Sequence, residues 1–239
     1  MNKYIFKDKA LGSYKFELDD QTFVPTQTTN CIIHASLKVL EKDSSILDLG
    51  CGCGIVAILL AKHAEYDIAL NASDLSDTVE SVVKKNAIEY GVDINVRKSN
   101  IFDAWGQKKF DLIINDISGV SDKIASISPW FKNISCEAGE GGNLLVNKVM
   151  DDAHNHLNRG GKLIFPIISF SNKKAILEKA DKLFKNVDLI EKQEWPVPKE
   201  MFEHIDLLES LKEEGLIDFK ISFGQLIGYT EIYSAYSFL

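Results

Sequence analysis

Residues 47–54 read LDLGCGCG, an apolar stretch that runs into three glycines at alternate positions. Glycine accepts positive φ and allows another backbone or a ligand to approach closely. An ordinary turn from strand to helix needs one such residue, whereas this loop has Gly50, Gly52 and Gly54. The helix-favouring segment GIVAILLAKHA follows directly. The loop therefore predicts a strand, a ligand-binding turn and a helix in succession, which is the first unit of an α/β fold.

The remaining sequence repeats this alternation of strand-like and helix-like segments. Further strands are predicted at 66–74, 93–100, 110–116, 161–169, 186–198 and 226–238, and helices at 77–91, 144–157 and 172–184. Such alternation predicts a mostly parallel sheet covered on both faces. The last two strands have no crossover between them, so the last strand is predicted to be antiparallel. The expected fold class is therefore α/β, with a Rossmann-like, doubly wound, seven-stranded sheet.

Two segments lie outside this alternation. Residues 1–40 are expected to form an N-terminal arm or cap, and residues 41–239 the ligand-binding domain. An acidic segment at 198–215 separates the last two strands, and its apolar residues recur every three to four positions, which predicts a helix with one buried face. This helix is compatible with packing on the sheet edge, with a lid over the substrate and with a homodimer contact.

The charge balance bears on which partners the protein binds. The 239 residues carry a net charge of −8, and the paired lysines are scattered among acids. A nucleic-acid partner is disfavoured, because such binding is driven by a basic face that neutralises phosphates.

We expect a cytoplasmic protein without membrane contact, since no apolar run could span a bilayer and the first residues lack a signal-peptide core. Cys51 and Cys53 have C-x-C spacing without a second pair, so no metal site is expected.

Polar side chains end the predicted parallel strands. They are Asp48, Asp74, Asn100 and Asn115. Ligands of doubly wound sheets bind at these carboxyl ends, and an acidic residue about 20 positions after the glycines commonly binds ribose hydroxyls. Asp48 places a carboxylate within the glycine turn, which disfavours a pyrophosphate and suits a ligand with an amine or sulfonium group.

Five motifs together resemble class I S-adenosylmethionine-dependent methyltransferases. They are LDLGCGCG (47–54), Asp74, SNIFD (99–103), FDLIIND (110–116) and LNRGGKLIFP (157–166), and the resemblance covers about residues 40 to 238. It implies S-adenosyl-L-methionine as the cofactor. The glycine loop and Asp48 would lie against its methionine part, and Asp74 would hold its ribose. The full set of implied cofactor-binding residues is Asp48, Gly50, Cys51, Gly52, Asp74, Leu75, Asn100, Ile101 and Asn115.

A narrower resemblance concerns the branch that methylates glutamine or exocyclic amino nitrogens. FVPTQTT (23–29) and an Asn at the end of the fourth strand are similar to that branch, which carries Asn-Pro-Pro-Tyr/Phe there. This chain instead has Asn115-Asp116-Ile117-Ser118. Asn115 and Asp116 are the predicted catalytic residues, with Asn115 positioning the acceptor and Asp116 binding or deprotonating an amine. Capping of the following turn by Asp116 is an equal alternative.

The resemblance implies a transferase that methylates an amine or amide nitrogen of a small molecule, a peptide or a protein. Two alternatives stay open: a non-methylating enzyme that transfers the aminocarboxypropyl arm or cyclises the cofactor, and a non-catalytic cofactor-binding module. Thr28, Thr29 and Ser118 are predicted to contact the substrate. Trp130 and Phe131, in the loop at 116–140, are candidates for the walls of its pocket.

Overall fold

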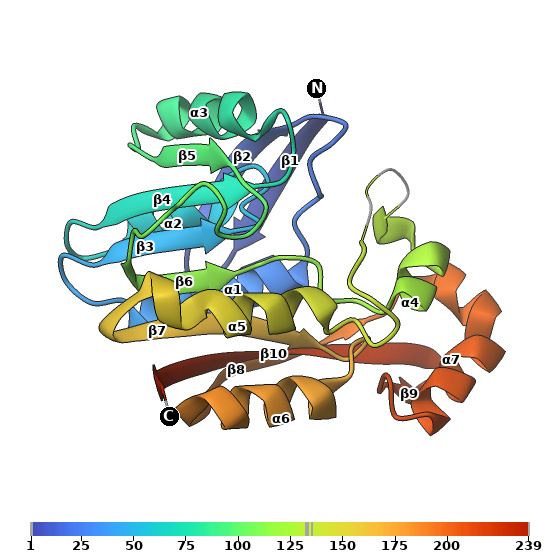
Figure 1. The fold of residues 1–239 in the computed structure, drawn as a ribbon. Helices are drawn as coiled ribbons and strands as arrows, with labels where there is room; N and C mark the ends of the chain where they lie inside the picture. The colour runs from blue at the N-terminus through green and yellow to red at the C-terminus, as the bar shows by residue number, and fades with distance from the viewer. Residues whose placement is uncertain (1, 132–133, 135, 239) are drawn as a thin grey trace.

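The computed structural model describes residues 2–131, 134 and 136–238, so part of the loop at 116–140 lies outside the described residues. Its central sheet has the order β5-β4-β3-β6-β7-β10-β8, and the short β9 pairs with β10 (Figure 1). The strands of the main path are β5 (Asn95–Lys98), β4 (Ala69–Asp74), β3 (Ser45–Leu49), β6 (Phe110–Asn115), β7 (Leu157–Ile168), β10 (Gln225–Phe238) and β8 (Phe184–Pro196). β3 to β7 pair in parallel, whereas β10 is antiparallel to both β7 and β8. The predicted fold class is confirmed, with β9 (Lys220–Ser222) as one additional strand.

Helices cover both faces of the sheet. One face carries α1 (Gln27–Val39), α2 (Ile55–His63) and α3 (Val79–Tyr90), and the other carries α5 (Leu144–His156) and α6 (Lys173–Leu183) (Figure 1). Successive strand residues point to opposite faces. In β3, Ile46 therefore packs in the core under α1 and α2, while Leu47 packs in the core under α5. The same alternation determines which side chains at the ends of neighbouring strands lie on the same face of the sheet.

Residues 2–39 are more structured than the expected arm. They form the antiparallel hairpin of β1 (Asn2–Asp8) and β2 (Gly12–Leu18), followed by α1. Phe6, Phe16 and Ile32 are buried in the same core as the sheet. The side chain of Asn86 on α3 fastens the hairpin, because it bonds the backbone of Glu17 in both directions and donates to the carbonyl of Cys53.

The acidic segment after β8 is helical, as its periodicity predicts. It consists of a 3₁₀ helix, η2 (Lys199–His204), and α7 (Ile205–Glu213). Met201, Leu208 and Leu211 are buried in a third core together with Ile124 of α4 (Asp122–Ile127). Packing within the chain therefore buries the apolar face of the segment formed by η2 and α7. Among the described helices, none has the length and apolarity needed to cross a membrane.

Candidate functional site

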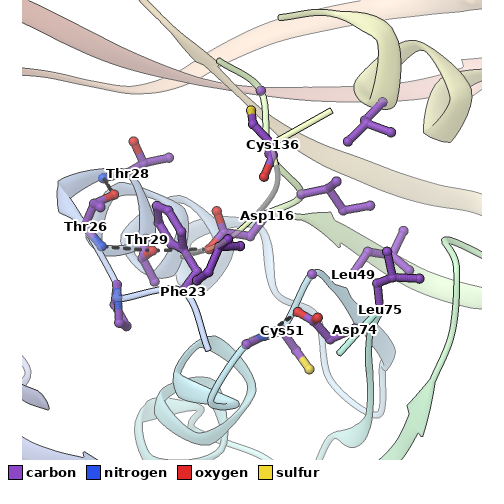
Figure 2. Close-up of a pocket in the computed structure, with 18 of the residues that line it drawn as sticks. Phe23, Thr26, Thr28, Thr29, Leu49, Cys51, Asp74, Leu75, Asp116 and Cys136 are labelled. Carbon is purple, nitrogen blue, oxygen red and sulfur yellow. Dashed lines mark hydrogen bonds between the residues drawn. The ribbon is translucent and has the colours of Figure 1, made fainter. Parts of the chain in front are cut away.

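A cavity of about 970 Å³ lies at the carboxyl ends of the parallel strands. Its lining comes from the ends of β3 to β8, from the approach to α1, from the 3₁₀ turn η1 (Pro129–Phe131), and from Ile134, Cys136 and Glu137. Figure 2 shows Cys51, Asp74 and Leu75 on one side of Asp116, and Thr26 and Thr28 on the other. The cavity is therefore centred where the strand order reverses between β3 and β6, the usual ligand position in a doubly wound sheet.

The glycine loop brings the end of β3 against the end of β6. Gly50 has φ of 75°, and a Cβ atom there would lie 2.9 Å from the carbonyl carbon and oxygen of Asp116. The amide of Asp116 in turn donates to the carbonyl of Leu49 at 2.8 Å. Glycine is required at position 50 for both its conformation and its close approach to the next strand, so the loop and Asp116 form one rigid unit.

Asp74 ties the glycine loop to the end of β4. Its Oδ2 accepts the amide of Gly52 at 3.0 Å, and its Oδ1 accepts the amide of Ser76 at 3.0 Å. Each carboxylate oxygen has a further lone pair that can accept a bond from a ligand hydroxyl. Next to it, the side chain of Leu75 lines the cavity and is 65% exposed. Ile101 also lines the cavity at φ of 49°, an unusual conformation for a β-branched residue and of the kind found at binding sites.

Three carboxyl groups lie close enough to influence one another. Burial raises the pKa of Asp48 to about 7, the backbone amide of Ala57 opposes the shift, and the charge of Asp74 adds to it. Burial, followed by the charge of Asp48, holds the pKa of Asp116 well above its usual range. Asp48 Oδ1 is buried without a hydrogen-bond partner in the described part of the chain. This cluster favours a cationic ligand, which would relieve the repulsion and the desolvation.

The pleat of β6 separates the two predicted catalytic residues. The side chain of Asn115 is 1% exposed, accepts the amide of Ile117 at 3.4 Å and lies outside the cavity lining. Ile113, two residues earlier, packs in the core under α5, whereas Ile114 packs under α1 and α2. Asp116 continues the register of Ile114 and lines the cavity. Of the pair, the structure therefore brings Asp116 to the cavity.

The N-terminus of α1 supplies the predicted substrate-contacting threonines. Thr26 caps the helix, and Thr29 completes a capping box by accepting the amide of Thr26. The hydroxyl of Thr29 also donates to Asp116 Oδ2 at 3.2 Å (Figure 2). Thr28 shares a 2.9 Å hydrogen bond with Thr230 of β10. Thr28, Thr29 and Ser118 all line the cavity.

The other predicted residues are placed as follows. Gly50, Cys51, Gly52, Leu75, Asn100 and Ile101 line the cavity, as do Trp130 and Phe131, whereas Asp48 lies beneath the loop. Sequence reasoning did not include Ile168, Trp195 and Pro196, which line the cavity from the ends of β7 and β8. The rule that ligands bind at the carboxyl ends of parallel strands would have found them had it been extended to those two strands.

Comparison with known proteins decides the class of this site. Residues 29–116 match the family model "Methyltransferase small domain", a span that includes the glycine loop, Asp74 and Asp116. Over these residues the chain is similar to a methyltransferase small domain. The resemblance to S-adenosylmethionine-dependent methyltransferases, and with it the cofactor that they use, is thereby confirmed.

The chain is similar in sequence to glutamine methyltransferases of release factors. Release factor glutamine methyltransferase of Streptococcus pneumoniae is 25% identical over 171 residues, which are 69% of this chain and 61% of that protein. The enzyme of the same name from Flavobacterium psychrophilum is 27% identical over 201 residues, 78% of this chain and 70% of that protein. This chain thus spans about three fifths of the length of the first relative. The E. cuniculi Mtq2–Trm112 complex, which methylates the termination factor eRF1, contains a chain with the same fold at a TM-score of 0.56, 14% identity, and coverage of 92% of this chain and 100% of that chain.

The residues present fit S-adenosylmethionine. The cofactor carries a sulfonium and an ammonium group, and the three carboxyls with the orphaned Asp48 Oδ1 form an environment that favours positive charge. Asp74 has lone pairs for ribose hydroxyls, and the exposed Leu75 offers an apolar surface to a flat ring. Among the described residues, no cluster of His, Cys, Asp or Glu is placed to hold a metal ion.

Proposed function

We propose that the protein transfers the methyl group of S-adenosylmethionine to an amine or amide nitrogen. Three observations support this: the methyltransferase domain, the cationic fit of the loop, and the names of the relatives, which are glutamine methyltransferases. The observation that carries the proposal is the position of Asp116. Its backbone touches Gly50 of the cofactor loop, and its side chain faces the rest of the cavity.

Asp116 takes the place that the branch motif gives to Asn. Because Asp116 rather than Asn115 faces the cavity, the tetrad of this chain is Asp116-Ile117-Ser118-Gly119. A protonated carboxyl presents one carbonyl acceptor and one O–H donor, much as a carboxamide presents an acceptor and donors. In either protonation state Asp116 has an oxygen that accepts a hydrogen bond, so it can hold a substrate nitrogen as the Asn of the motif does.

The raised pKa of Asp116 suits this residue for managing a proton. When bound, S-adenosylmethionine supplies a methyl group activated by its sulfonium, and a nitrogen that accepts the methyl group must release a proton. When Asp116 is in its carboxylate form, its raised pKa makes it a stronger base than an ordinary Asp. Asp116 is assigned to hold the nitrogen by a hydrogen bond and to take up that proton, while Thr29 fixes the orientation of its carboxyl group.

The test is the variant Asp116→Asn, which keeps the shape and an acceptor oxygen but cannot take up the proton. We expect S-adenosylmethionine binding to be retained in calorimetry and kcat to fall roughly 10²–10⁴-fold, assayed with glutamine peptides and a panel of amines. Asp122→Asn, at the first residue of α4 and outside the cavity lining, is the control and should keep full activity. Unchanged turnover of Asp116→Asn at saturating acceptor would refute the assignment. Formation of methylthioadenosine instead of S-adenosylhomocysteine would show transfer or cyclisation of the aminocarboxypropyl arm.

A further inference from the structure

The cavity has two parts of different chemistry, and Asp116 stands between them. The part over β3, β4 and β5 is lined by the glycine loop, by Asp74 and by aliphatic side chains such as Leu75, and it fits the cofactor. The part at the ends of β6, β7 and β8 contains four aromatic residues, which define what we call the aromatic lobe: Phe23, Trp130, Phe131 and Trp195. Its remaining walls are largely aliphatic or proline, including Val120, Leu145, Pro166, Ile168, Pro196 and Pro198.

The back wall of the aromatic lobe is rigid. The rings of Trp195 and Trp130 meet edge to face at 5.7 Å, and the buried ring of Phe170 lies 5.9 Å from the first and 6.1 Å from the second. The indole N–H of Trp195 donates to Thr230 at 3.0 Å. A Cβ atom on Gly228 would lie 2.8 Å from this indole, so the glycine makes room for the ring. The indole is thus held in place before any ligand binds.

Two hydroxyl groups near this lobe already have hydrogen-bond partners. The hydroxyl of Thr28 bonds Thr230, and that of Thr29 bonds Asp116. Within the described residues, the hydrogen bond to the Asp116 carboxyl is at Oδ2, which leaves Oδ1 for a ligand. The Asp116 side chain lines the cavity at the boundary between its two parts. Ligand pockets span roughly 300–1,000 Å³, and this cavity of about 970 Å³ is at the upper end, with room for a second molecule beside the cofactor.

We propose that the methyl acceptor is a low-molecular-weight aromatic compound whose reacting nitrogen lies on or next to its ring, with the ring held in the aromatic lobe and the nitrogen at Asp116. This inference rests on the proposed function and narrows its substrate. Ring edges and faces pack favourably on Trp130 and Trp195, which adds to simple apolar burial. A bare carboxamide side chain, by contrast, would leave those rings uncontacted and would bring donors and acceptors that need polar partners.

The test measures binding without turnover, so that it stands apart from the test of catalysis. The full chain is saturated with S-adenosylhomocysteine and titrated by calorimetry with 6-aminoquinoline, cyclohexylamine and propionamide. The first carries a flat ring, the second a saturated ring and the third the carboxamide of a glutamine side chain. We expect 6-aminoquinoline to bind about tenfold or more tightly than either of the others.

Variants of Trp130 locate the ring. This side chain is partly buried and packs against the third core, so each variant is first checked for folding by circular dichroism. Trp130→Ala and Trp130→Leu should lose the preference for 6-aminoquinoline, the second despite its retained apolar volume, whereas Trp130→Phe should keep most of it. Phe202→Ala, an exposed aromatic residue outside the cavity lining, is the control and should bind like the wild type. Equal affinities for the three compounds, a preference for propionamide, or unchanged binding by a folded Trp130→Leu protein would overturn the proposal.

Discussion

Replacing Asp48 by Asn should stabilise the protein at alkaline pH. The pKa of this fully buried carboxyl is about 7 in the folded protein against 3.8 for an unperturbed Asp, so the unfolded chain releases the proton first as pH rises. The free energy of unfolding therefore falls by about 1.4 kcal/mol per pH unit across the window from about pH 4 to 7. At pH 8 the free energy of unfolding of the wild type is therefore lower by about 4 kcal/mol in total. The Asp48→Asn protein does not lose this stability, because Asn has no charge to bury.

Urea unfolding followed by circular dichroism at pH 5, 6, 7 and 8 measures this effect. The stability gained by Asp48→Asn over the wild type should grow by about 3 kcal/mol between pH 5 and pH 8, because most of the titration falls within this window. Asp67→Asn, at an exposed position, is the control and should show no such trend. A gain that is independent of pH, or a loss at pH 8, would refute the reasoning. An effect in the expected direction would show that the site holds destabilising charge in the absence of a cation.

Three further substitutions test how the site is held together. Gly50→Ala should abolish measurable S-adenosylmethionine binding in calorimetry, because its Cβ would meet the backbone of Asp116 at 2.9 Å in a left-handed conformation. Thr29→Val removes a hydrogen bond that lowers the pKa of Asp116, so the ascending limb of the pH–rate profile should move to higher pH; an unmoved limb would contradict this. Asn86→Ala should lower the free energy of unfolding by about 3 kcal/mol in urea titrations, because it leaves buried backbone groups of the hairpin and the glycine loop unpaired.

Local sequence patterns were enough to predict most of the fold and the cofactor half of the site. The alternation of strand and helix, the glycine loop and Asp74 are contiguous signals, and each acts through backbone geometry within a few residues of itself. For this reason β3, α2 and β4 lie close to their predicted positions. The structure of the first forty residues was harder to predict from the sequence. The hairpin and α1 owe their stability to burial against the sheet core, and a local sequence pattern does not show such burial.

The substrate half of the site was decided by tertiary structure. The sequence placed Asn115 and Asp116 together at a strand end, but which of the two reaches the cavity depends on the pleat of β6 relative to α1 and α5. The raised pKa of Asp116 likewise arises from burial and from the charge of Asp48, which is remote in sequence. Trp130 and Trp195 meet across 65 positions because β8 and η1 end at the same edge of the fold. The sequence thus determined the type of fold and the cofactor loop, since these depend on neighbours along the chain, whereas the acceptor pocket depends on neighbours in space.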